Sequence, residues 1–160
     1  ELHYINIGKS RLAGVETMCK IQINRHINVH GAYNYLYTSK DADGVRLSSS
    51  SPHSGNIRAE YNTRIPRYAT VVNLSGNIMG KKKFDVLDEL EIDGKKVEAY
   101  YQAKVNPYCL WDLTVSQYIM QNLRITAGIT NLFDYTSDRV TFNTSTSPGR
   151  NYFIACNYTL

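Results

Sequence analysis

Hydrophobic and polar side chains alternate with a period of two along most of this chain. The clearest case is the segment 54–65, where the odd-numbered residues from Ile57 to Ile65 are apolar or mildly polar. The even-numbered residues between them are Asn, Arg or Glu. Because successive side chains of a strand point to opposite faces, this pattern predicts a strand with one dry face and one charged face. Its length of about ten residues is enough for a tilted strand to cross a bilayer.

The same period predicts about eight strands along the whole chain. Short turns near residues 25, 66 and 121 alternate with long segments near residues 45, 90 and 140. All long segments therefore lie at one end of an antiparallel up-and-down sheet, as in transmembrane β-barrels. Within the largest of them, Asp93-Gly94 predicts the tip of a β-hairpin. The predicted strands cover residues 2–8, 11–24, 27–39, 54–65, 69–80, 108–119, 123–133 and 150–160.

The charged residues decide which way the predicted sheet faces. In a soluble barrel the polar face would point outward, and a closed interior would have to hold many tyrosine hydroxyls. In a membrane barrel the polar face lines a wet lumen, and tyrosines near the strand ends meet lipid headgroups. An Arg or Lys facing lipid would cost about 2–4 kcal/mol near the midplane. We therefore predict an all-β transmembrane barrel whose lumen is lined by Glu16, Lys20, Arg58, Glu60, Arg64, Asp112 and Arg124.

The composition allows a membrane barrel and excludes a helical membrane protein. The 160 residues (18.2 kDa) include 42% hydrophobic residues, and the mean hydropathy is -0.37. No run approaches the roughly 20 apolar residues that a spanning helix needs. The 13 tyrosines suit a membrane interface, because the ring is apolar and the hydroxyl is polar, although they also suit a half-exposed sheet.

Charge and cysteine content add little specific chemistry. The net charge is +4, and much of it comes from Lys81–Lys83 and Lys95–Lys96, which we interpret as part of a solvated loop. The sequence has no basic stripe with interleaved aromatic residues, so we expect no nucleic-acid partner. The cysteines lack metal-ligand spacing and fall in phase with apolar neighbours, which predicts small hydrophobic residues at Cys19, Cys109 and Cys156.

Patterns typical of catalytic and metal sites are also lacking in the sequence. The acidic residues between Asp85 and Asp93 match no calcium-loop spacing, and we interpret them as a solvated loop. The four histidines are scattered, with His26 at a turn and His53 at the end of a long loop. No nucleophile–base pair can be argued from the spacing. We therefore predict no enzymatic activity, no catalytic residue, no metal centre and no cofactor.

Three strings in the sequence resemble segments of TonB-dependent outer-membrane receptors. The run Tyr4–Glu16 resembles a Tyr-x-Asn strand followed by a short loop and a Gly-Val-Glu strand. The run Leu123–Asp134 ends in Asn-Leu-Phe-Asp, like the penultimate strand of these barrels. The run Pro148–Tyr158 is similar to their closing Pro-Gly-Arg-x-Tyr strand. The strings also follow the family's order, and together they reach from one end of the chain to the other.

The resemblance implies that residues 1–160 form a C-terminal barrel segment, about the last third of a 22-stranded barrel. The N-terminal plug domain and the earlier strands would then lie outside this sequence. It also implies a receptor in the bacterial outer membrane for energy-coupled uptake of a scarce nutrient, of the ferric siderophore, haem or cobalamin class. The partners would be outer-membrane lipid, the receptor's own plug domain, the TonB complex and the small ligand. In a haem importer, a loop histidine such as His53 would be a candidate axial ligand.

Two other classes of protein remain open at this stage. About eight strands also suit a small, self-contained structural or adhesive outer-membrane barrel without active transport. A soluble ligand-binding barrel is the third possibility. A native gene product of this length with no plug would favour the small barrel. Partition of the native protein into buffer without detergent would favour the soluble barrel.

Overall fold

Nine β-strands make up most of the described chain and confirm the predicted all-β class. The structure is a computed structural model that describes residues 11–39, 51–92, 95–120, 122–136 and 148–159. None of these residues belongs to a helix with the length and apolar character that a membrane crossing demands. The strands are β1 (Leu12–Gln22), β2 (Ile27–Thr38), β3 (His53–Asn62), β4 (Thr70–Met79), β5 (Lys82–Ile92), β6 (Lys95–Val105), β7 (Tyr108–Ile119), β8 (Leu123–Thr130) and β9 (Asn151–Tyr158).

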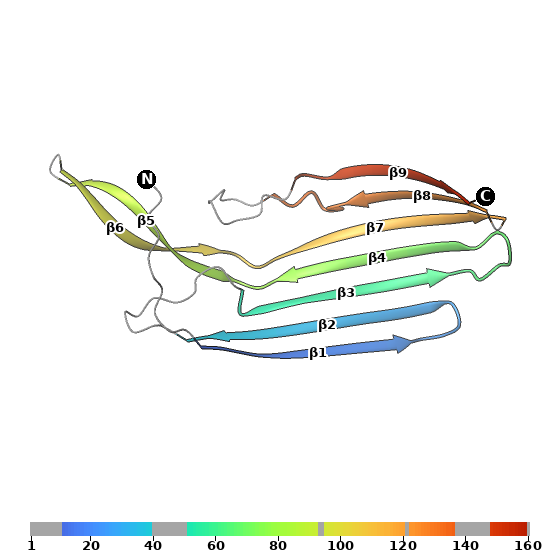
Figure 1. Cartoon of the computed structure of the whole chain (residues 1–160), viewed down its shortest axis with the longest axis horizontal. Coiled ribbons are helices and arrows are strands. Elements are labelled where there is room, and N and C mark those ends of the chain that lie inside the picture. The colour runs from blue at the N-terminus through green and yellow to red at the C-terminus, as the bar shows by residue number, and fades with distance from the viewer. Residues whose placement is uncertain (1–10, 40–50, 93–94, 121, 137–147, 160) are drawn as a thin grey trace.

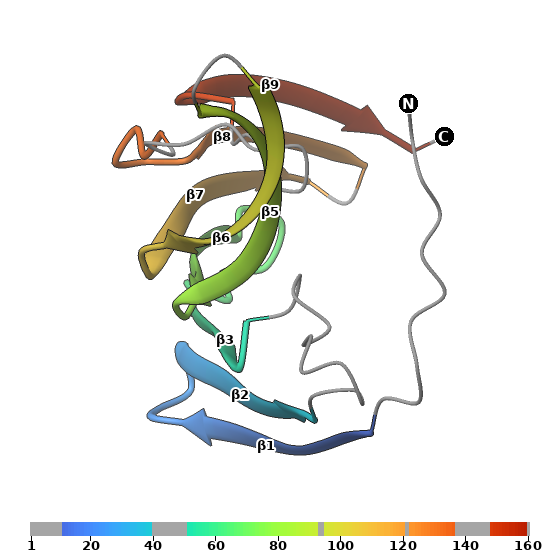
Figure 2. The same cartoon turned by 90° about the vertical axis from the view of Figure 1, so that its left-hand side faces the viewer.

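Seven of the strands form one antiparallel sheet in the order β1-β2-β3-β4-β7-β8-β9. Neighbouring strands follow one another along the chain, except that β5 and β6 separate β4 from β7. Viewed end-on, the sheet bends into an arc (Figure 2). The described strands do not close on themselves, because β1 pairs only with β2 and β9 pairs only with β8. The sheet is therefore an open section of a barrel wall.

Strands β5 and β6 form a second, two-stranded sheet that extends beyond the long-loop end of the barrel wall (Figure 1). Ile92 pairs with Lys95, which confirms the predicted hairpin, while the two predicted tip residues 93–94 lie outside the described residues. The interpretation of the acidic run as a loop was wrong for Asp85–Glu91, because these residues pair with β6 and lie within β5. Pairing with β6 satisfies the backbone hydrogen bonds of these residues. Their acidic side chains give no indication of that pairing.

The alternation of short turns with long connections is confirmed. Turns between β1 and β2, β3 and β4, and β7 and β8 lie at one end of the sheet, and the strand ends that the longer connections join lie at the other (Figure 1). Two strands end three residues earlier than predicted. β3 ends at Asn62, because its side-chain Oδ1 accepts the Arg64 N–H (2.8 Å) and Arg64 turns away with φ 52°. β8 ends at Thr130, because Asn131 adopts φ 51°. The predicted strand at 2–8 lies outside the described residues.

One face of the seven-stranded sheet is apolar throughout its middle. Strand register aligns a single row across it, composed of Ile21, Val29, Ala59, Leu74, Leu113 and Ile129. The three cysteines are unpaired and share this face, as predicted. Among the described residues, Val105 is the only buried hydrophobic side chain, with 7% exposure. The sheet therefore has no core of its own, and its apolar face requires lipid or protein to cover it.

Gly128 on β8 allows the aromatic ring of Phe153 on β9 to lie directly against the sheet. A Cβ atom at position 128 would overlap the Phe153 ring and lie 3.1 Å from Cγ2 of Thr114. We expect Gly128→Ala to destabilise the complete barrel by about 1–3 kcal/mol, the usual cost of overpacking. Urea unfolding in detergent micelles measures this loss. In a Phe153→Ala background the same substitution should cost much less, and an equal cost in both backgrounds would contradict the proposed clash.

Candidate functional site

The candidate site is the polar face of the seven-stranded sheet. Strand register places Lys20, His30 and Arg58 side by side across β1, β2 and β3. The same row continues through Ser75 on β4 to Asp112 on β7. Alternation along the strands brings six of the predicted lumen residues to this one face. They are Glu16, Lys20, Arg58, Glu60, Asp112 and Arg124.

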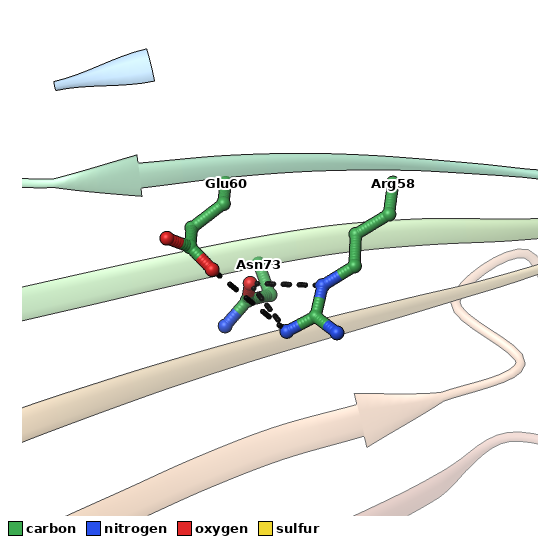
Figure 3. Close-up of polar contacts among 3 residues, drawn as sticks. All are labelled: Arg58, Glu60 and Asn73. Carbon is green, nitrogen blue, oxygen red and sulfur yellow. Dashed lines mark hydrogen bonds and ion pairs between the residues drawn. The ribbon is translucent and has the colours of Figure 1, made fainter. Parts of the chain in front are cut away.

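Arg58 lies at the centre of the polar contacts on this face (Figure 3). Its Nη2 and Nε donate to Oδ1 of Asn73 at 3.0 and 3.3 Å, and Nη2 lies 3.9 Å from Oε2 of Glu60. The Arg58 side chain is 55% exposed, so this ion pair contributes little stability, within about 1 kcal/mol. Asn73 was not singled out in the sequence, because alternation shows the face of a residue but not its partner on the next strand. The contacts hold the guanidinium in position while leaving its other N–H groups accessible.

Lys20 and Arg58 flank His30 in this row, so two positive charges lie two strands apart on the polar face. Among the described residues, the only ion pair that involves this row joins Arg58 to Glu60. An anionic group placed against this part of the polar face would be attracted by both charges. The face is therefore suited to contacts with carboxylates or other anions.

Asp112 has a different role from the exposed charges, because its carboxylate Oδ1 accepts the backbone N–H of Asn131 at 2.9 Å. Asn131 is 5% exposed. Its Nδ2 donates to the carbonyl of Tyr135 and its Oδ1 accepts the N–H of Tyr135, both at 2.8 Å. The Tyr135 ring stacks on that of Tyr108, with centroids 4.9 Å apart. These contacts fix the chain where β8 gives way to the long connection.

The other end of the same connection is held by Asp134, whose Oδ1 accepts the N–H of Arg150 at 2.7 Å. We call Asp112, Asn131 and Asp134 the loop clasp. The clasp brings together the Asn-Leu-Phe-Asp and Pro-Gly-Arg strings on which the family resemblance rests. Sequence reasoning did not assign a role to Asn131 or Asp134. Their residue types could have indicated a turn, because Asn and Asp tolerate positive φ well. Both residues adopt it, with φ of 51° and 56°.

The remaining predicted residues lie in distinct environments. Arg124 is on the polar face, with its guanidinium carbon 5.9 Å from the centre of the Tyr118 ring, a cation–π contact. Arg64 lies in the turn after β3 and not in a strand. His53 is on the apolar face, where its Nδ1 is 2.7 Å from the Tyr33 hydroxyl and its ring is 5.2 Å from that of Tyr35. Its role as a haem ligand stays a prediction, and its surroundings are those of an aromatic cluster at the start of β3.

No group of three or more His, Cys, Asp or Glu side chains is placed to hold a metal ion within the described ranges. The polar face offers ionic and hydrogen-bonding contacts, as Arg58 shows with Asn73 and Glu60.

An open antiparallel sheet with one apolar and one charged face, and with all long connections at one end, defines the wall of a transmembrane β-barrel. Residues 2–132 match the family model described as TonB dependent receptor-like, beta-barrel. The chain belongs to this family, whose members are receptors of the bacterial outer membrane. Among proteins with curated functions, none matches the sequence.

Solved structures of bacterial receptors share the fold. The ferripyoverdine receptor of the Pseudomonas aeruginosa outer membrane, bound to ferripyoverdine, is 18% identical with a TM-score of 0.72, covering 93% of this chain and 19% of that chain. A mutant of the ferric enterobactin receptor from Pseudomonas aeruginosa is 19% identical with a TM-score of 0.71, covering 96% and 23%. The siderophore receptor of Acinetobacter baumannii is 18% identical with a TM-score of 0.70, covering 92% and 22%. The chain thus spans about a fifth of the length of these receptors.

Proposed function

We propose that this chain is the C-terminal barrel segment of an outer-membrane receptor that imports a scarce nutrient by energy-coupled transport. The observation that supports this proposal most directly is the exposed polar face centred on Arg58, Glu60 and Asn73, in a chain of the TonB-dependent receptor family. A charged wall of this kind suits a lumen that holds water or protein, because the same residues facing lipid would be costly. Among nutrient classes, ferric siderophores are favoured, since the structural neighbours include receptors for ferripyoverdine and ferric enterobactin.

The polar face would hold the receptor's own plug domain in the lumen by hydrogen bonds and ion pairs. Residues 1–160 would form the C-terminal barrel segment, and the plug and the earlier strands would come from the rest of the receptor. Energy delivered by the TonB complex would rearrange the plug so that the ligand can pass along this face. The connections at 40–53, 81–107 and 134–149 would form part of the ligand-binding rim. The loop clasp supports this arrangement by fixing the base of the third connection.

Uptake measurements test this proposal directly. In a strain that lacks its own siderophore receptors, the complete receptor should restore uptake of at least one radiolabelled ferric siderophore. The same uptake should fall to background when TonB is deleted. Arg58→Gln should reduce uptake severalfold by weakening contacts across the lumen, whereas Asn77→Gln, on the same face and with no hydrogen bond to Arg58 among the described residues, serves as the matched control. Siderophore uptake that persists without TonB, or that is never restored, would overturn the proposal.

A further inference from the structure

The short turns carry positive charge without acidic partners. Residues 23–26 connect β1 to β2, and residues 63–69 connect β3 to β4. Together these two turns contain three arginines and no Asp or Glu. Exposed apolar side chains lie beside the arginines: Ile23 is 62%, Ile65 54% and Tyr68 52% exposed. We call this set the turn rim, and its members are Ile23, Arg25, Arg64, Ile65, Arg67 and Tyr68.

Two of the arginines occupy backbone positions that do not favour arginine. Arg64 has φ 52° and Arg67 has φ 68°, in the left-handed region where Gly and Asn are most easily accommodated. Within the described chain, neither guanidinium makes a hydrogen bond or ion pair that would explain the choice of residue. The turn therefore carries a conformational cost that Gly or Asn would lower. A cost of this kind, kept at an exposed position, points to a function for the side chain itself.

The position of Arg25 shows where this charge lies relative to the membrane. Its Nε donates to Nε2 of His26 at 2.8 Å, and the Nδ1 of His26 bonds to the carbonyl of Asn62 at 2.7 Å. The His26 ring lies 6.2 Å from the ring of Tyr61. Tyr61 shares the apolar face of β3 with Ala59, since the two are separated by one residue. Arg25 is thus anchored at the end of the apolar face, at the level where acyl chains give way to headgroups.

We propose that the turn rim binds the phosphate groups of anionic phospholipids in the leaflet at the turn end of the barrel. Arginine forms paired hydrogen bonds with phosphate oxygens, and isoleucine and tyrosine beside it suit the upper part of the acyl chains. The three positive charges without a nearby acid select an anionic lipid over a zwitterionic one. This proposal rests on the barrel spanning a membrane, and it does not depend on the transported ligand.

Lipid exchange measured on the complete receptor tests the proposal. The receptor in detergent micelles is titrated with phosphatidylglycerol or with phosphatidylcholine, and bound lipid is counted by native mass spectrometry. We expect tighter binding of phosphatidylglycerol, and a loss of about fivefold in its affinity for each arginine removed. The test variant is Arg64→Asn with Arg67→Asn, because asparagine tolerates the left-handed backbone and should keep the turn folded.

Two further variants separate charge from turn geometry. Met120 has φ 58° in the turn between β7 and β8, so Met120→Asn makes the same kind of backbone change without removing a charge, and it should keep phosphatidylglycerol binding. Arg64→Lys with Arg67→Lys should lose only part of the affinity, since charge remains but paired hydrogen bonds do not.

Equal affinity of the wild type for both lipids would overturn the proposal and leave an acidic protein as the partner to consider. An equal loss in Met120→Asn would overturn it as well. In both cases siderophore uptake could remain intact, so the outcome is separate from that of the transport proposal.

Discussion

Replacing Asn131 with alanine should destabilise the base of the connection between β8 and β9 by about 3 kcal/mol. The side chain makes two hydrogen bonds with the backbone of Tyr135 in a buried position, each contributing about 1 kcal/mol, and alanine is disfavoured by roughly another 1 kcal/mol at φ 51°. The loss should be local, because strand pairing elsewhere in the sheet does not involve this side chain.

Hydrogen exchange at the Tyr135 amide gives the direct measurement. A change of about 3 kcal/mol corresponds to roughly a 100-fold faster exchange if this amide exchanges through local opening. Asn131→Gly is the matched control, since it loses the same two hydrogen bonds but accommodates positive φ, and it should have a smaller effect. Unchanged protection of Tyr135 in the alanine variant would contradict the role assigned to the loop clasp.

Introducing an arginine on the apolar face should impair the barrel far more than the same change on the polar face. Leu74 lies in the middle of the apolar row, so Leu74→Arg should cost about 2–4 kcal/mol for placing the charge toward lipid. The free energy of unfolding of the complete barrel in lipid vesicles, from guanidinium titration, measures this cost.

Asn77 on the same strand provides the control for that experiment. It is exposed on the polar face, opposite Asn56 on β3, so Asn77→Arg should change stability by less than about 1 kcal/mol. The opposite ranking of the two variants would show that the polar face looks toward lipid, and the proposed lumen would then be wrong.

The period-two pattern was sufficient to predict the fold class, the faces and the alternation of short turns with long connections. It works because the side-chain period of a strand is fixed by backbone geometry and depends on no distant residue. The hairpin at residues 93–94 was predictable for a similar reason, since Asp-Gly suits a two-residue turn.

The contacts that define the site depend on register, which the pattern leaves open. Arg58 could be assigned to a face from the sequence, but its bond to Asn73 follows from the pairing of β3 with β4. The strand ends were overestimated for another reason. Arg64 continues the alternation in sequence, yet its backbone turns at that position, and arginine carries no signal for positive φ. Among the described non-glycine residues with positive φ, only Asn131 and Asp134 are of residue types that indicate it.

The direct pairing of β4 with β7 has a consequence for how such a protein can change over evolution. The β5–β6 hairpin forms a ladder of its own, so insertions, deletions or replacement within it would break no hydrogen bond of the barrel wall. The length and sequence of this hairpin could thus change while the pairing that holds the wall together stays the same.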